Sequence, residues 1–184
     1  LPILMGRFLY GLKKKADYAV ISLAGGQKDN AITRECITEF LTDAPEEVKA
    51  YAKELQEQIR EEYTGSDENI TIEVKENEVE TAQVLHPTSQ EKIVFYLQNV
   101  PFGIQKMSGT IKGLVESSSN IGILRLDEDE LFASSSVRSS VDAACSAISD
   151  KIEYLTEFLG GDYEVQGAYP AWEYRKDSPL RDKM

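Results

Sequence analysis

The chain has 184 residues, 32 of them acidic and 20 basic, and its formal net charge is −12 at pH 7. Nucleic-acid phosphates and anionic membrane surfaces repel such a chain, so neither is expected as a partner. A hydrophobic content of 41%, with no apolar run of the roughly 18 residues that a membrane span needs, favours a soluble, cytoplasmic globular protein.

The first half of the chain predicts a helix, two strands, a second helix and a third strand. Apolar residues recur at three- and four-residue steps over the opening PILMGRFLYGLKK, as on one face of a helix. Strands follow in DYAVISLAG and over residues 31–41, with Gly25 and Gly26 as turn residues between them. Asp43 is expected to cap the second helix, and NITIEVK, residues 69–75, alternates as a strand.

The second half repeats this order. A capping box over Thr88–Glu91 predicts a helix that stops before Pro101, and Ser140 is expected to cap a later helix closed by glycine. The predicted strands of this half lie over residues 113–126 (broken near Asn120), 131–139 and 163–169.

Two α-β-β-α-β units, over residues 1–75 and 88–168, indicate a structural duplication. Each unit lacks only a leading strand to be ferredoxin-like. The predicted fold is therefore α+β, with two ferredoxin-like units forming an antiparallel sheet that has helices on one face. Residues 169–184, in which Pro170 turns the chain and a helix pattern breaks off, favour a segment cut from a larger protein.

Catalytic and metal-binding patterns are missing from the sequence. His86 is the only histidine, it stands before Pro87, and a solvated loop histidine is the expected interpretation. Cys36 and Cys145 have no metal-ligand spacing and fit a reducing compartment. We expect no catalytic residue and no bound metal in this chain, which leaves binding as its predicted activity.

The stretch LFASSSVRSS, residues 131–140, contains the strongest binding candidate. Side chains on a strand alternate between two faces, so Leu131 and Val137 are expected under the helices, whereas Phe132 and Arg138 face away. A guanidinium among small hydroxyl side chains can bind a carboxylate through two parallel hydrogen bonds. An idle surface arginine fits the pattern as well, so the residues alone leave both interpretations open.

Several motifs, taken together in this order and spacing, resemble a known family. GLVESSSNIGILRLDEDELFASSSVRSSVDA and GAYPAWEYRKDSPL, with GRFL and GGQKDNAITREC upstream, resemble the lid segment of aminoacyl-histidine dipeptidases. These Xaa-His dipeptidases belong to the zinc peptidase superfamily that also holds carboxypeptidase G and acetylornithine deacetylase. The resemblance covers essentially the whole chain.

The resemblance implies a lid, or dimerisation-type, domain that closes over a dipeptide substrate. It also implies zinc or another divalent metal in the protein's own catalytic domain, with none bound by this segment, which would be inactive alone. A homodimer through an exposed edge strand is a further implied association.

Four residues match lid positions of the family. Arg138 matches the arginine expected to hold the substrate's terminal carboxylate, and Asn30 matches the lid asparagine. Asn120, with Glu116 beside it, is a weaker substrate-binding candidate. Thr33 departs from the family, which has proline there, and the lid histidine of a Gly-His-Ser-Gly strand is not present.

Two other functions remain open on the sequence. Duplicated ferredoxin-like folds also serve as amino-acid-sensing regulatory modules, and fold analogy supports that alternative. A pure dimerisation domain, in which Arg138 makes only surface contacts, is the other.

Overall fold

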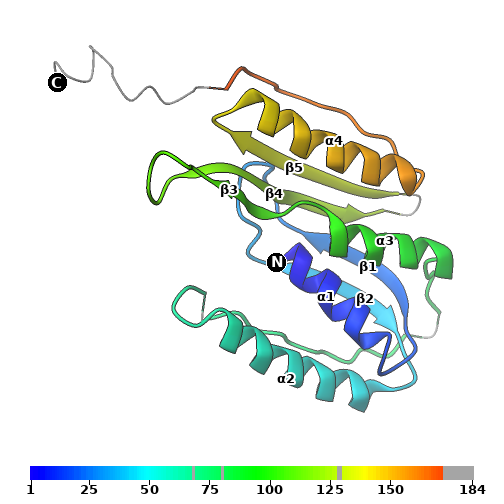
Figure 1. The fold of residues 1–184 in the computed structure, drawn as a ribbon. Coiled ribbons are helices and arrows are strands. Elements are labelled where there is room, and N and C mark those ends of the chain that lie inside the picture. The colour runs from blue at the N-terminus through cyan, green and yellow to red at the C-terminus, as the bar shows by residue number, and fades with distance from the viewer. Residues whose placement is uncertain (68, 80, 128–129, 172–184) are drawn as a thin grey trace, which may run out of the picture.

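The structure is a computed structural model that describes residues 1–67, 69–79, 81–127 and 130–171. The predicted tail pattern beyond residue 171 lies outside the described residues. Within these ranges the elements are α1 (Pro2–Leu12), β1 (Ala19–Gly25), β2 (Cys36–Leu41), α2 (Pro45–Glu62), α3 (Pro87–Asn99), β3 (Gly103–Met107), β4 (Val115–Leu126), β5 (Leu131–Ser139) and α4 (Asp142–Phe158), as Figure 1 shows.

The five strands form one antiparallel sheet, in which β4 is central. β5 pairs with β4 from Ser117 to Leu126 along one edge of β4. Because β3 and β1 pair with parts of that same stretch, they share the opposite edge of β4. β2 pairs with β1 at the far side of the sheet. The two halves of the chain therefore meet where β1 pairs with β4.

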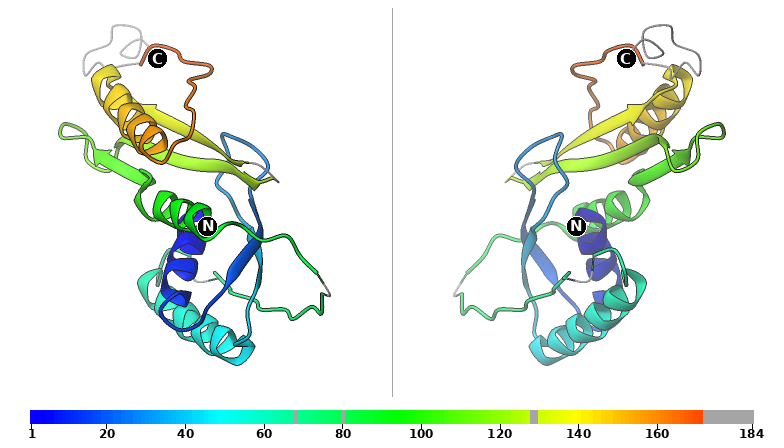
Figure 2. Two further views of the ribbon diagram at one scale, coloured as in Figure 1. Left: turned by 90° about the vertical axis from the view of Figure 1, so that its right-hand side faces the viewer. Right: turned by 90° about the vertical axis from the view of Figure 1, so that its left-hand side faces the viewer.

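All four helices lie on one face of this sheet, which is clearest in the side views of Figure 2. One buried cluster joins α1, α2 and β1 and includes Leu12 and Leu55, which are 0% and 1% exposed. A second cluster joins α3, α4, β4 and β5 around Leu97 and Leu124. The predicted α+β class, an antiparallel sheet with helices on one face, is confirmed.

Four of the expected strand assignments need correction. Residues 69–75 and 163–169 form no strand, and the second strand begins at Cys36 rather than at residue 31. The strand expected to break near Asn120 is continuous, since Asn120 pairs with Ser136 within β4. In residues 69–75 the alternating apolar side chains pack against the first core, while the Ile72 amide donates to the Gln56 side chain at 2.7 Å instead of to a neighbouring strand. An alternating pattern therefore shows which side chains are buried, but it does not show that the segment pairs with another strand.

β3 is a strand that the sequence pattern missed. Four of its five residues are exposed, so it carries no hydrophobic alternation. It forms because β4 is long enough to pair with it beside β1. The second half therefore has one more strand before its last helix than the first half has.

The helix starts also differ from the expected caps. The α2 cap is Ala44, whose amide donates to Thr42 Oγ1 at 3.2 Å, and Asp43 makes no cap bond. α3 begins one residue before Thr88, and α4 begins at Asp142 with an N-cap that lacks a side-chain bond. The observed N-cap residues are Ala44, His86 and Val141, each one or two residues from the cap that the sequence predicted.

β4 contains a bulge at Gly122 that changes which residues face the helices. Ile121 pairs with Ser135, whereas Ile123 pairs with Ser134, so Gly122 is an extra residue in β4. Odd-numbered side chains face the helices before the bulge, and even-numbered ones, such as Leu124, face them after it. The Ile121 carbonyl oxygen at this bulge accepts a hydrogen bond from the loop that follows β1.

Candidate functional site

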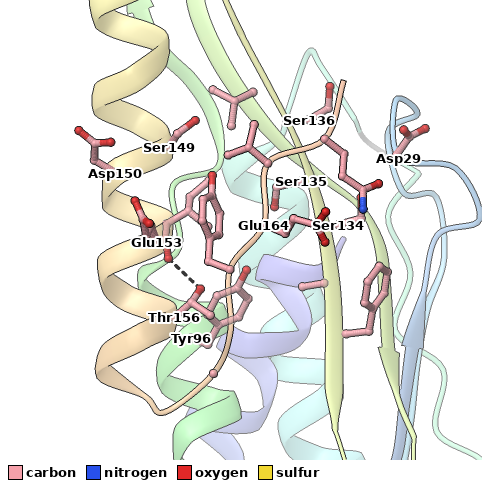
Figure 3. A pocket seen from close by; sticks show the side chains of 18 of the residues that line it. Asp29, Tyr96, Ser134, Ser135, Ser136, Ser149, Asp150, Glu153, Thr156 and Glu164 are labelled. Carbon is pink, nitrogen blue, oxygen red and sulfur yellow. Dashed lines mark hydrogen bonds between the residues drawn. The ribbon is translucent and has the colours of Figure 1, made fainter. Parts of the chain in front are cut away.

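The helix-covered side of β5 is packed, as the alternation predicts. Leu131, Ala133 and Val137 pack against the second core, and Figure 3 shows Ser135 and Tyr96 on the α4 side of the strand. Burial raises the pKa of the Tyr96 hydroxyl to about 12, so this group is neutral at physiological pH. This side of the strand is structural.

The open side of β5 carries Arg138, which is exposed and pairs with Ser118 of β4 across the sheet. Among the described residues, its guanidinium makes no ion pair and no hydrogen bond. Arg125 lies on the same face and differs, because it donates to Asp127 at 2.8 Å and lies 5.4 Å from the centre of the Phe132 ring. Of the two arginines that the structure describes on this face, Arg138 is thus the one without an ion-pair partner, which leaves its guanidinium able to bind an anion.

Glu116 lies on the open face two residues before Ser118 in β4. Its Oε1 atom is 2.6 Å from Lys106 Nζ of β3, and its side chain is only 12% exposed. The predicted site residue Glu116 is therefore already paired with a cation within the chain. Its role as a substrate ligand stays a prediction.

Asn30 lies in the loop between β1 and β2, which begins at Gly26 with a φ of +74°. Its backbone amide donates to Asp29 Oδ1 at 2.8 Å, and its side-chain amide makes no hydrogen bond to a described residue. Asn120 supports this loop from β4, because its Nδ2 donates to the Ala31 carbonyl oxygen at 2.8 Å. Asn120 thereby holds the loop that carries Asn30 against β4.

Two further contacts fix the same loop on the bulge of β4. Thr33 is 4% exposed, and its hydroxyl donates to the Ile121 carbonyl oxygen at 2.7 Å. A Cβ atom at Gly122 would collide with the carbonyl oxygens of Lys28 and Asp29. The threonine that replaces the family's proline therefore holds the loop through a hydrogen bond.

An open groove of about 2440 Å³ follows β5. Asn30, Glu116 and Arg138 line it, whereas Asn120 does not. The turn residues predicted at Gly25 and Gly26 end β1 and begin the loop, and Pro170 is exposed in the segment after α4. The lining of this long groove includes both faces of β5, such as Val137 and Arg138, so three of the four predicted residues lie along one extended surface, and the fourth, Asn120, supports the loop beside it.

The groove presents hydrogen-bond donors that can bind a ligand. Among the described residues, no group of three or more His, Cys, Asp and Glu side chains is placed to hold a metal ion. His86 caps α3, since its Nδ1 accepts the Thr88 amide at 3.2 Å. Cys36 packs against the second core, where burial raises its thiol pKa to about 11. An exposed guanidinium and an exposed carboxamide remain, and both are donors suited to an anionic or carbonyl oxygen.

Comparison with known proteins gives two informative similarities, while no protein-family model matches the sequence. The chain is 26% identical over 179 residues to the cytosol non-specific dipeptidase of Escherichia coli (strain K12). It superposes on the crystal structure of aminoacylhistidine dipeptidase from Vibrio alginolyticus with a TM-score of 0.90 and 27% identity, over 98% of this chain. The chain is homologous to one segment of these dipeptidases.

The chain spans 37% of the length of each of these two proteins. None of the helices among the described residues is long and apolar enough to cross a membrane.

Sequence reasoning missed Lys106 and the loop contact of Thr33. Lys106 lies on the exposed strand β3, which carries no apolar pattern, and the Thr33 contact depends on a bulge that only the pairing of β4 and β5 defines.

Proposed function

We propose that this chain is the lid of a metal-dependent dipeptidase, and that Arg138 binds the free carboxylate of a dipeptide, including dipeptides that end in histidine. The carrying observation is the unpaired guanidinium on the open face of β5, with small serine side chains beside it. A planar guanidinium binds a carboxylate through two parallel hydrogen bonds. The homology to dipeptidases supports this choice of anion.

Asn30 has a different role in the proposal. Its carboxamide donates a hydrogen bond to a carbonyl oxygen of the bound dipeptide, while Asn120 and Thr33 hold the loop in place. In this proposal the divalent metal, zinc or another, belongs to the catalytic domain of the complete dipeptidase, as the resemblance to that family implies. The role proposed for this segment is to position the substrate.

The test is Arg138→Ala in the complete dipeptidase that contains this segment. A charge-assisted pair of this kind contributes up to about 3 kcal/mol, so kcat/KM for a dipeptide that ends in histidine is expected to fall roughly 100-fold. Arg125→Ala is the matched control, because it removes an arginine from the same face that already has partners. Its kinetics should stay close to those of the wild-type enzyme.

A second substrate separates carboxylate binding from general damage. With a dipeptide amide, which has no terminal carboxylate, the wild-type enzyme and the Arg138→Ala variant should differ by less than about twofold. An equal loss with both substrates, or unchanged kinetics with the free dipeptide, would rule out the role of Arg138.

We also propose that the segment associates with a second copy of itself, on a separate observation. Tyr154 and Phe158 lie one turn apart on α4, are 72% and 73% exposed, and have ring centres 6.5 Å apart. Beside α4, β5 pairs only with β4 among the described residues, so its other edge is open. Exposed aromatic side chains and an open strand edge both favour association.

Sedimentation of the chain at several concentrations tests this association. The wild-type chain should show a dimer whose fraction rises with concentration, and Phe158→Glu should shift it to monomer. Tyr10→Glu is the control, since Tyr10 is an exposed aromatic residue on α1, away from this surface. A wild-type chain that stays monomeric at high concentration would exclude association through this surface.

A further inference from the structure

Glu116 of β4 lies between two cations of the adjacent strands. On one side, the register of the β3–β4 pairing shifts between Lys106 and Met107, so Glu116 is an extra residue of β4 there, and Lys106 contacts its carboxylate at 2.6 Å. On the other side, Arg138 of β5 pairs with Ser118, so Glu116 is its diagonal neighbour on the same face. The carboxylate therefore has two possible partners, one on each adjacent strand.

The distance to Arg138 does not prevent that pair. Diagonal neighbours on adjacent strands have Cα atoms about 7–8 Å apart, which long side chains can bridge. Glu116 nevertheless contacts Lys106, and Arg138 has no ion-pair partner among the described residues. Of the two cations on its neighbouring strands, Glu116 therefore pairs with Lys106 and leaves Arg138 unpaired.

Burial makes this choice consequential. The Glu116 side chain is 12% exposed, whereas Lys106 is 61% exposed. A largely buried carboxylate that loses its cation carries a high desolvation cost, so it moves to another cation nearby. Arg138 is the cation on the neighbouring strand, and an Arg138–Glu116 pair would compete directly with a bound carboxylate.

We propose that Lys106 holds Glu116 away from Arg138 and so keeps Arg138 free for the carboxylate of the substrate. Lys106 is a positioning residue in this account, and the account rests on the proposed role of Arg138. It also gives β3 a function, because this strand has four exposed residues out of five and adds little to the core. β3 carries the cation that neutralises Glu116.

The test compares kinetic constants of four variants of the complete dipeptidase with a dipeptide that ends in histidine. Lys106→Met should raise KM about fivefold with kcat nearly unchanged, because a competing ion pair weakens ground-state and transition-state binding alike. Lys106→Arg should retain the wild-type KM. Lys112→Met is the matched control, since it removes one positive charge from the turn between β3 and β4, and Lys112 makes no ion pair with a described residue. The double variant Lys106→Met/Glu116→Gln leaves no carboxylate there to pair with Arg138, so its KM should lie below that of Lys106→Met.

Three results would overturn the proposal. They are an unchanged KM in Lys106→Met, an equal rise in Lys112→Met, and a double variant as impaired as Lys106→Met. A crystal structure of the Lys106→Met chain supplies a readout that does not depend on substrate. Arg138 and Glu116 should then lie within 4 Å of each other, and a wider separation would also overturn the proposal. If this pair forms while Arg138→Ala leaves the kinetics unchanged, Lys106 does hold Glu116 away from Arg138, but the carboxylate-binding role of Arg138 fails, and with it the effect of Lys106 on KM.

Discussion

The helix-covered and open faces of β4 and β5 are built from the same serine-rich stretches but differ in burial and charge. Ser117 and Ser119 lie under the helices and are 3% and 1% exposed. Ser118 of β4 lies between these two serines but faces the open side, where it pairs with Arg138. Ser136 of β5 lies on the same open face and pairs with Asn120. One face therefore stabilises the fold, while the other is the face proposed to bind substrate, so substitutions on the two faces should have separate effects.

The largest effect on stability is expected on the helix-covered face. Leu124→Ala removes a side chain that is 1% exposed and packs in the second core. Loss of its buried surface and the cavity left behind should lower the free energy of unfolding by about 3 kcal/mol. Denaturant unfolding of the chain measures this value.

Ile104→Ala provides the comparison on β3, since Ile104 is 60% exposed. Its effect should stay within about 0.5 kcal/mol. Equal losses for the two variants would contradict the division of the sheet into a packed face and an open face.

The second effect tests how closely the loop after β1 lies on the open face. Gly122→Ala places a Cβ atom against the carbonyl oxygens of Lys28 and Asp29. Such overpacking should cost about 1–3 kcal/mol and displace the loop, and unfolding together with loop chemical shifts would report both. Gly109→Ala is the control, because a Cβ atom there meets nothing within 4 Å.

Much of the fold followed from the sequence because the helices carry strong periodic patterns. The alternation over β5 also assigned Arg138 to the open face correctly. The strand expected over residues 163–169 did not form, although Tyr163 packs against the second core as an alternating pattern requires. Periodicity reports which side chains are buried, and it does not supply the neighbouring strand that a ladder needs.

The candidate site was less accessible to sequence reasoning. Family resemblance identified Asn30 and Arg138, which contribute to one groove. The sequence had no means of showing that Asn120 supports the loop or that Lys106 pairs with Glu116. Both contacts link residues on different elements, so they depend on strand pairing rather than on local pattern.

A third, smaller effect should come from the hydrogen bond of Asn120. Asn120→Ala removes the donor to the Ala31 carbonyl oxygen, so stability should fall by about 1 kcal/mol. The Ala31 amide, which donates to the Lys28 carbonyl oxygen at 3.2 Å, should exchange its hydrogen faster as the loop opens more often. Ser136→Ala, at the position that pairs with Asn120, should change neither quantity. Unchanged exchange at Ala31 in Asn120→Ala would show that the loop is held by other contacts.

The smallest effect on stability is expected from a change that still impairs the proposed binding. Ser118→Leu places a bulky side chain on the open face directly across from Arg138, where no core packing is disturbed, so stability should change by less than about 0.5 kcal/mol. If Arg138 binds substrate as proposed, the leucine covers its guanidinium, and kcat/KM of the proposed dipeptidase should fall about tenfold, mainly through KM. Ser134→Leu makes the same change on the same face four residues from Arg138, roughly 13 Å along the strand, and should leave KM unaltered. Equal kinetic losses in the two variants would mean that bulk anywhere on the open face interferes, and that the serine beside Arg138 has no special part in keeping it accessible.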